Sequence, residues 1–249
     1  MAGHSKWKQI KRQKGVADQR RGALFTKLAR EITLAAKQGG ADPDGNFRLR
    51  LAVQNARDNN MPAENIQRAI SRATGPSEGG DLLEITYEGY GPAGVAILIE
   101  AMTDNRNRTV GEIRSVFTRA GGNLGESGSV AWQFESRGVI TISTDGTSDD
   151  EIADAAIEAG ADDFRLDTDS VDVFTAPSDL ESVRQALLDS GLEILSAELS
   201  MIAKSSIAVE AKEAEQIIRL LEKLEDLDDV QKVYSNAEFS DEVLAAVSA

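Results

Sequence analysis

The chain of 249 residues contains no cysteine. This absence excludes structural disulfides, thiolate catalysis and zinc sites built on cysteine. A protein without disulfides relies on buried apolar surface, and its hydrophobic content of 41% is ordinary for a soluble globular protein. The length predicts two or three domains, each large enough to hold a core of its own.

Histidine is nearly absent as well, because His4 is the only one. It lies in a polar N-terminal segment, so a Ser-His-Asp or Cys-His catalytic site would need its base there. The glycine-rich stretch GGNLGESGS is not followed by Gly-Lys-Ser or Gly-Lys-Thr, so it lacks the signature of a P-loop. The sequence therefore predicts no enzyme, no cofactor, no metal site and no small-molecule substrate.

Long apolar runs are missing too. No stretch approaches the roughly 20 apolar residues that a membrane-spanning helix needs. The first residues are polar and basic, unlike the apolar region of a secretory signal. We expect a cytoplasmic protein that does not use a membrane as its partner.

What the sequence does have is an uneven distribution of charge. Residues 1–75 hold 15 Lys and Arg against 6 Asp and Glu, a net of +9. The remaining residues hold 12 Lys and Arg against 36 Asp and Glu, a net of −24. Such asymmetry favours a nucleic-acid contact at the basic end. The alternative is a basic segment that docks on the acidic part of the same chain.

The first eighteen residues form a basic arm with few apolar side chains. Cationic side chains can replace the counterions that condense on phosphates, a contact that depends on salt rather than on sequence. The arm also holds a tryptophan, which could stack on an unpaired base or anchor the arm to the helices behind it. The candidate nucleic-acid-binding residues of the arm are Lys6, Trp7, Lys8, Lys11, Arg12 and Lys14.

Three helices are predicted behind the arm. Apolar residues recur with helical period over 19–38, 47–59 and from Pro62 to Gly75. Residues 1–77 are therefore expected to form a basic helical domain. The first of these helices places Arg20, Lys27 and Arg30 away from its apolar face, so its surface is basic.

The acidic remainder alternates strands and helices. Residues 83–90 and 95–103 predict the two strands of a hairpin. Thr109 and Glu112 form a capping box that predicts the start of a helix, and residues 130–135 predict a further strand. Over 137–205 the predicted order β-α-β-β-α-β is that of a ferredoxin-like domain. The last β-α-β unit cannot bury a sheet alone, so we expect it to complete the first sheet. The predicted class is α+β with several domains: the helical domain, a discontinuous α/β domain over 78–136 and 206–249, and a ferredoxin-like α/β domain over 137–205 inserted into it.

Two further segments are candidates for binding, and a third is assigned to the core. Arg106 and Arg108 beside a helix start could hold phosphate or pair with acidic neighbours. Val130, Trp132 and Phe134 would share one face of the predicted strand, where a core role is favoured over stacking on bases. The loop 121–129 is rich in glycine, which lets a partner approach the backbone closely or simply allows a tight connection. Its candidate residues are Gly121, Gly122, Asn123, Gly125, Ser127, Gly128 and Ser129.

Several long motifs occur in one order: AGHSKW, FTKLAREI, NMPAENI, YEGYGPAGVAI, TDNRNRT and GGNLGESGSVAWQF. Together they resemble the YebC family of probable transcriptional regulatory proteins, over residues 1–139 and more loosely to the C-terminus. The resemblance implies a helical domain and two α/β domains, and a cytoplasmic DNA-binding regulator of transcription. It also implies that the first helix contacts nucleic acid together with the arm, through Arg20, Arg21, Lys27 and Arg30. Similar proteins, including the mitochondrial translational activator of cytochrome c oxidase, act on ribosomes. Ala93 and Gln133 depart mildly from the family pattern.

Two hypotheses of function remain open. The chain could be a DNA-binding transcriptional regulator, although nothing marks side chains that read base edges. It could instead bind ribosomal RNA as a translation factor that relieves stalling at difficult stretches such as consecutive prolines. Both make it a non-enzymatic, nucleic-acid-binding regulator of gene expression whose partner is DNA, ribosomal RNA or the ribosome. A weaker third possibility is a protein-interaction scaffold that works through its acidic face.

Overall fold

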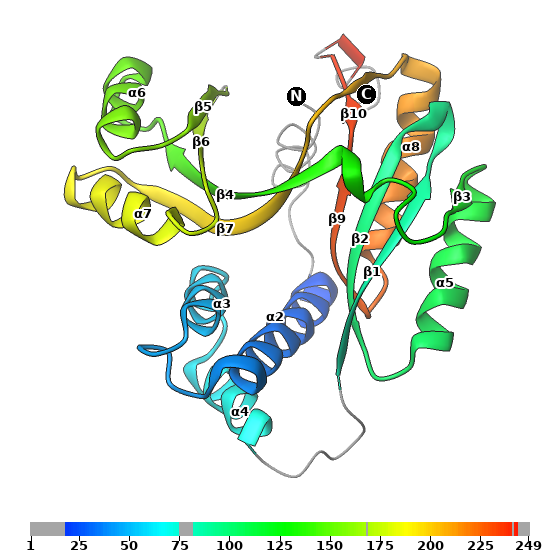
Figure 1. Ribbon diagram of the computed structural model, residues 1–249, viewed down its shortest axis with the longest axis horizontal. Coiled ribbons are helices and arrows are strands. Elements are labelled where there is room, and N and C mark those ends of the chain that lie inside the picture. Colours follow the sequence, from blue (N-terminus) through cyan, green and yellow to red (C-terminus); the bar gives the residue numbers. More distant parts are fainter. Residues whose placement is uncertain (1–17, 75–81, 168, 241, 244–249) are drawn as a thin grey trace. The chain divides into compact units, whose positions relative to one another are not determined.

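A computed structural model describes residues 18–74, 82–167, 169–240 and 242–243 of the chain (Figure 1). The described residues of its N-terminal part form three helices, as the apolar periodicity predicts: α2 (Asp18–Gly39), α3 (Phe47–Asp58) and α4 (Ala63–Thr74). They share one apolar core, formed chiefly by Leu28, Ile32, Leu49, Val53, Ile66 and Ile70. The connection from α3 to α4 turns at Asn60, whose φ is 58°.

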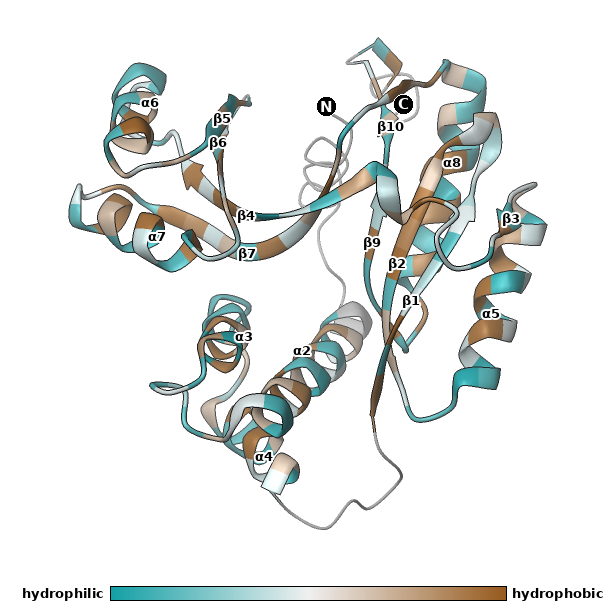
Figure 2. Cartoon of the chain, viewed as in Figure 1, coloured by the Kyte–Doolittle hydropathy of each residue, from teal (hydrophilic) through white to brown (hydrophobic). Residues whose placement is uncertain are grey.

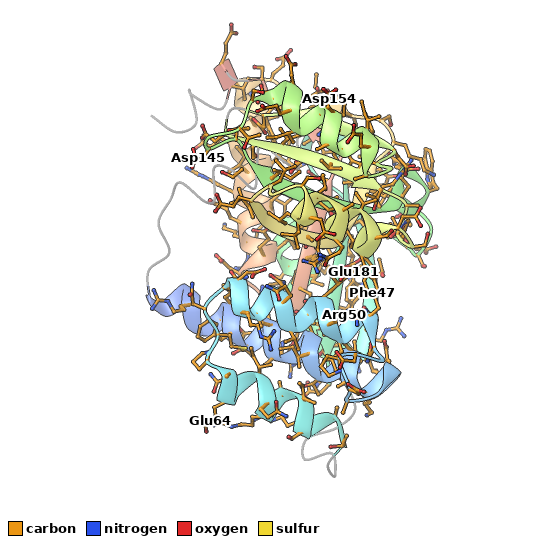
Figure 3. The ribbon with its side chains drawn as sticks, turned by 90° about the vertical axis from the view of Figure 1, so that its left-hand side faces the viewer. Phe47, Arg50, Glu64, Asp145, Asp154 and Glu181 are labelled. Atoms are coloured by element: carbon orange, nitrogen blue, oxygen red, sulfur yellow. The ribbon has the colours of Figure 1, made fainter. Side chains whose placement is uncertain are left out.

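Asn46 joins the first two of these helices. Its side chain is buried and donates to the carbonyls of Ala35 and Gly40, both at 2.8 Å. Its amide oxygen accepts from the backbone N–H of Leu49, so the same residue ends α2 and begins α3. Figure 3 labels two further residues of α3, Phe47 and Arg50, where the guanidinium carbon lies 5.9 Å from the ring centroid.

The first sheet has the strand order β3-β1-β2-β9. Strands β1 (Leu83–Tyr90) and β2 (Ala96–Thr103) form the predicted antiparallel hairpin, joined by the short 3₁₀ turn η1 (Pro92–Gly94). Strand β3 (Asn123–Leu124) pairs with β1. Strand β9 (Val230–Ser235) comes from the end of the chain and pairs antiparallel with β2, which completes the sheet in the way that the sequence predicts.

Helices α5 (Arg106–Arg119) and α8 (Ala211–Glu225) pack on the core of this sheet. Figure 2 shows β2 as the most hydrophobic of its strands, in keeping with a burial pattern in which all but one of its residues are buried. The core contains Ile97 and Ile99 of β2, Phe117 of α5 and Leu221 of α8. The short strands β8 (Ile207–Ala208) and β10 (Ala237–Glu238) form a separate parallel pair.

The second large sheet has the order β5-β6-β4-β7. Its elements follow the chain as β4 (Phe134–Ser143), α6 (Asp149–Glu158), β5 (Asp163–Leu166), β6 (Ser170–Thr175), α7 (Leu180–Asp189) and β7 (Ile194–Ala203). This β-α-β-β-α-β succession, with the first and third strands in the centre, is the ferredoxin-like arrangement. The fold class predicted from the sequence is therefore confirmed.

Contacts divide the chain into two compact units. One contains the three helices and the β3-β1-β2-β9 sheet, and it resumes at Ala203 after an interruption. The other consists of Glu135–Ile202 together with Arg57–Asn60. The division into three domains with boundaries near 77, 136 and 205 stays a prediction.

Three local predictions are wrong. Residues 131–133 form the 3₁₀ turn η2 (Ala131–Gln133) and not a strand, because the carboxylate of Glu88 binds the backbone N–H groups of Val130 and Ala131. Helix α5 begins at Arg106 instead of Thr109, since the side chain of Asn105 caps it by accepting from Arg108 N–H. Helix α7 has Asp179 in place of Ser178 at its N-cap. The capping box of Ser148 and Glu151 is confirmed.

Within the described ranges, no helix combines the length and the apolar character that crossing a membrane requires.

The first testable prediction concerns the packing of β1 against α5. A Cβ added to Gly89 would lie 2.6 Å from Phe117 Cζ and 2.8 Å from Asn123 O, in a core that cannot yield easily. We expect Gly89→Ala to lower the free energy of unfolding by about 1–3 kcal/mol, measured by urea denaturation. Gly111→Ala is the control, since it lies in α5 with no atom within 4 Å of an added Cβ. That change should be neutral or stabilise by up to about 1 kcal/mol; equal losses from both would contradict the prediction.

Candidate nucleic-acid interface

Most of the arm predicted to contact nucleic acid lies outside the described residues. This applies to Lys6, Trp7, Lys8, Lys11, Arg12 and Lys14, and to the side chain of Arg20. The next candidate, Arg21, is exposed on the first turns of α2. The described part of the predicted interface is therefore the remainder of α2, the start of α5 and the loop 121–129.

The two other candidates on α2 are engaged within the chain. The ammonium group of Lys27 donates to the carbonyl oxygen of Glu225 at 2.5 Å. The guanidinium of Arg30 donates to the carbonyl of Asp228 and lies 3.1 Å from the carboxylate of Asp229. The first contact is with the last residue of α8 and the second is with the turn between α8 and β9. Lys27 and Arg30 thus make the intramolecular contact that the division of charge also allowed.

Asp229 is the centre of these contacts. Its carboxylate is 2% exposed and accepts from Arg108 at 2.7 Å, from Thr109 Oγ1 at 2.7 Å and from Thr103 Oγ1 at 3.0 Å. Burial by itself would raise the pKa of this carboxyl, but the bonds from Arg108, Thr109 and Thr103 outweigh it and lower the pKa. One buried anion therefore holds α2, β2, α5 and the start of β9 together.

The two arginines at the start of α5 have different environments. Arg108 is paired with Asp229 and with Asp104, the latter at 3.0 Å. Arg106 is exposed and has no ion pair with another described residue. Arg106 is thus the member of the pair that could still reach a phosphate, whereas Arg108 takes the structural role.

The glycine-rich loop 121–129 is organised by a second buried carboxylate. Glu88 of β1 is 5% exposed and accepts from the N–H groups of Gly128 at 2.6 Å, Val130 at 2.7 Å and Ala131 at 2.7 Å. Burial raises the pKa of Glu88, and these three backbone hydrogen bonds more than reverse the effect, so that its pKa is lowered. Converging N–H groups of this kind can bind a phosphate, but here the carboxylate of the chain itself occupies them.

Two of the loop glycines are required by the packing of the loop on its own strand. A Cβ on Gly122 would lie 2.6 Å from the carbonyl oxygen of Tyr90. A Cβ on Gly125 would lie 2.5 Å from Ser129 Oγ. The close approach that the sequence suggested for a partner is made here by β1 and by the loop itself. Asn123, Ser127, Gly121 and Gly128 are exposed at the surface of the loop.

Three important residues were missed or misplaced by sequence reasoning. Glu88 and Asp229 lie in strand and turn segments where a solvated carboxylate is the usual interpretation, and no local signal marks their burial. Trp132 was assigned to the core, yet it is 68% exposed, whereas Val130 and Phe134 are buried as predicted. The 3₁₀ turn at residues 131–133 removes the alternation of a strand and directs the indole outward.

The part of the chain with described side chains contains no group of three or more His, Asp or Glu suited to a metal ion.

The fold and these interactions define an α+β protein with a helical N-terminal part and a discontinuous sheet. Comparison with known families matches residues 5–76 to the TACO1/YebC protein N-terminal domain and residues 82–237 to the TACO1/YebC second and third domain. The chain therefore belongs to the TACO1/YebC family, as the motifs indicate.

Its relatives match along nearly their whole length. A "Probable transcriptional regulatory protein" of Chloroflexus aurantiacus is 56% identical over 252 residues, with 100% of both chains covered. One of Herpetosiphon aurantiacus, with the same description, is 55% identical over 244 residues, covering 98% of this chain and 97% of the relative. The crystal structure of a conserved hypothetical protein from Aquifex aeolicus superimposes with a TM-score of 0.85 at 43% identity, covering 91% of this chain and 94% of that one. The names of the Chloroflexus and Herpetosiphon relatives describe both as probable transcriptional regulatory proteins, which supports a family of regulators.

The second testable prediction concerns Asp229. Asp229→Asn keeps the shape of the side chain but removes the charge and one acceptor, so we expect a loss of about 1–3 kcal/mol in the free energy of unfolding at pH 7. Asp228→Asn is the matched control, because that side chain is exposed and Arg30 binds only its backbone carbonyl. Urea denaturation of both variants checks the prediction, and similar stabilities for the two would refute it.

The third prediction concerns how the free energy of unfolding depends on Glu88 at low pH. Because the pKa of Glu88 is lowered by folding, its contribution is complete above the unfolded-state pKa of about 4.3 and is lost as the pH falls through the folded pKa. Glu88→Gln should cost about 1–3 kcal/mol at pH 7, since an amide cannot accept all three N–H bonds. The difference from the parent protein should shrink as the pH is lowered below 4. Glu126→Gln, an exposed position in the same loop, should stay within about 0.5 kcal/mol of the parent at every pH.

Proposed function

We propose that this protein is a non-enzymatic, nucleic-acid-binding regulator of gene expression that makes its main contact through the basic N-terminal segment. The division of charge carries the proposal, with a net of +9 over residues 1–75 and −24 over the rest. A basic end supplies affinity for phosphate, and the acidic remainder disfavours contact through other surfaces, so the charges orient the encounter. The names of the relatives support a regulatory role.

Three of the candidate contact residues have partners within the chain. Lys27, Arg30 and Arg108 are bound to acidic or carbonyl groups of the same chain. We assign them to positioning α2 and α5. The contact with nucleic acid is proposed for the basic arm and the start of α2, through Lys6, Trp7, Lys8, Lys11, Arg12, Lys14, Arg20 and Arg21. Arg106 is proposed as a more distant phosphate contact.

Two targets are compatible with such a contact. The names of the relatives favour DNA, with the protein acting as a transcriptional regulator. The 68% exposure of Trp132 favours RNA, because a large aromatic side chain at the surface suits the unpaired bases of RNA loops. Ribosomal RNA is therefore the second candidate target, with the protein acting as a translation factor.

The fourth testable prediction concerns the arm. Changing Lys6, Lys8, Lys11 and Lys14 to Glu should abolish binding to a short single-stranded RNA and to duplex DNA, measured by fluorescence anisotropy, because phosphate contacts supply most of the non-specific affinity. If about six phosphates are neutralised, the affinity of the parent should fall roughly a thousandfold between 50 and 200 mM salt.

A matched control separates the position of the charges from their number. Arg114, Lys212, Arg219 and Lys223 are exposed cations of the acidic part, and changing all four to Glu alters the formal charge by the same amount. This control should keep most of the affinity. Full binding by the arm variant, or equal losses in both variants, would show that the arm is not the contact.

Sedimentation decides between the two targets. Cell lysate containing the tagged protein is run through a sucrose gradient at low and moderate salt, beside the arm variant. Migration of the parent with ribosomes, lost in the variant, would favour the translation factor. Absence of both forms from the ribosome fractions, with recovery of genomic DNA bound to the parent alone, would favour the transcriptional regulator.

A further inference from the structure

Trp132 has the largest exposed fraction among the large hydrophobic side chains of the described residues, 68%. Tryptophan is one of the side chains that gain most from burial, so its place at a surface calls for a physical reason. The adjacent Val130 and Phe134 are 0% and 4% exposed. The chain therefore buries both neighbours of this residue and leaves the indole outside.

The polar atom of the indole is already satisfied. Trp132 Nε1 donates to the carbonyl oxygen of Ser129 at 3.1 Å. The hydroxyl of Tyr90, which is 36% exposed, donates to the same oxygen at 2.8 Å. Two exposed aromatic side chains from separate elements thus converge on one acceptor. With their donors occupied, what they can offer to another molecule is mainly the ring faces.

The backbone that carries the indole is held from two sides. The carboxylate of Glu88 binds the N–H of Ala131 at 2.7 Å. Lys204 donates from its ammonium group to the carbonyl of Trp132 at 3.0 Å, and from its backbone N–H to the carbonyl of Gln133 at 2.8 Å. Groups held in this way lose little conformational freedom when a ligand binds, which is the condition of a preorganised site.

Charge and hydrogen bonding limit the chemistry of the ligand. The N–H groups that could have cradled a phosphate in this loop are bound to Glu88. Stacking is therefore the interaction that the site offers. The exposed Lys204 adds one cation at the backbone carbonyl of Trp132, and its ammonium has donors left for a phosphate. A flat ring attached to a phosphate matches both features, and stacking requires that the base be unpaired.

We propose that Tyr90 and Trp132 form a stacking site for an unpaired base of single-stranded RNA, with Lys204 contacting an adjacent phosphate. This inference rests on the proposed nucleic-acid function and adds a second contact, distinct from the basic arm. The arm supplies affinity that depends on salt. The aromatic pair selects single strands over duplexes, because a paired base does not offer its face.

The test uses the full chain with Trp7→Phe, which leaves Trp132 as the only tryptophan of the two in the sequence. Titration with a short oligoadenylate should quench its fluorescence to saturation, whereas duplex DNA of the same length should not. In this background Trp132→Ala should weaken RNA binding about 5- to 150-fold, the range expected for one stacked base. Trp132→Phe keeps a ring and should lose less. Duplex affinity should be unchanged in both.

Leu188→Ala is the matched control, since Leu188 is 39% exposed on α7 and its truncation also removes surface apolar atoms. It should leave RNA affinity and thermal stability unchanged. If Trp132→Ala binds RNA as well as its parent while the arm variant loses binding, the stacking site is wrong and the proposed function stands. If the parent binds neither RNA nor DNA, both fail. Quenching by a proline-rich peptide and not by RNA would overturn the inference in favour of a protein-binding surface.

Discussion

The carboxylate of Asp229 is the interaction on which the larger unit of this protein depends. It joins the last turn before β9 to the end of β2 through Thr103, to the start of α5 through Thr109 and Arg108, and to α2 through Arg30. A buried charge is costly unless it is fully paired, and here cations and hydroxyls from three other segments provide the pairing. The helical part and the discontinuous sheet meet at this residue.

The uneven distribution of charge along the chain also serves contacts within the protein. Part of the positive charge of the N-terminal region is neutralised within the chain. Lys27 contacts the end of α8, Arg30 the turn before β9 and Arg48 the strand β1. The pair of Arg48 with Glu84 is partly exposed and contributes little to stability. The division of charge along the chain therefore serves contacts within the protein as well as any contact with a partner.

A second buried carboxylate, that of Glu88, explains why an aromatic side chain is exposed next to β1. Glu88 gathers the backbone N–H groups of the glycine-rich loop and converts the expected strand at 131–133 into a 3₁₀ turn. The same interaction that prevents the loop from holding a phosphate turns Trp132 outward beside Tyr90. The glycine-rich loop could have bound a phosphate through its N–H groups or presented an aromatic ring at the surface. The side chain of Glu88 excludes the first and favours the second.

The sequence by itself determined the class of fold, because helical and strand periodicity depend on neighbouring residues and the last β-α-β unit is too small to bury a sheet of its own. It also determined the uneven charge and, through its motifs, the family. Only the tertiary structure decided which carboxylates are buried and which cations pair with them. The reason is that Glu88, Asp229, Arg30 and Trp132 contact partners far away along the chain. Such long-range pairings leave no local pattern in the sequence, so the candidate site could be predicted by region but not residue by residue.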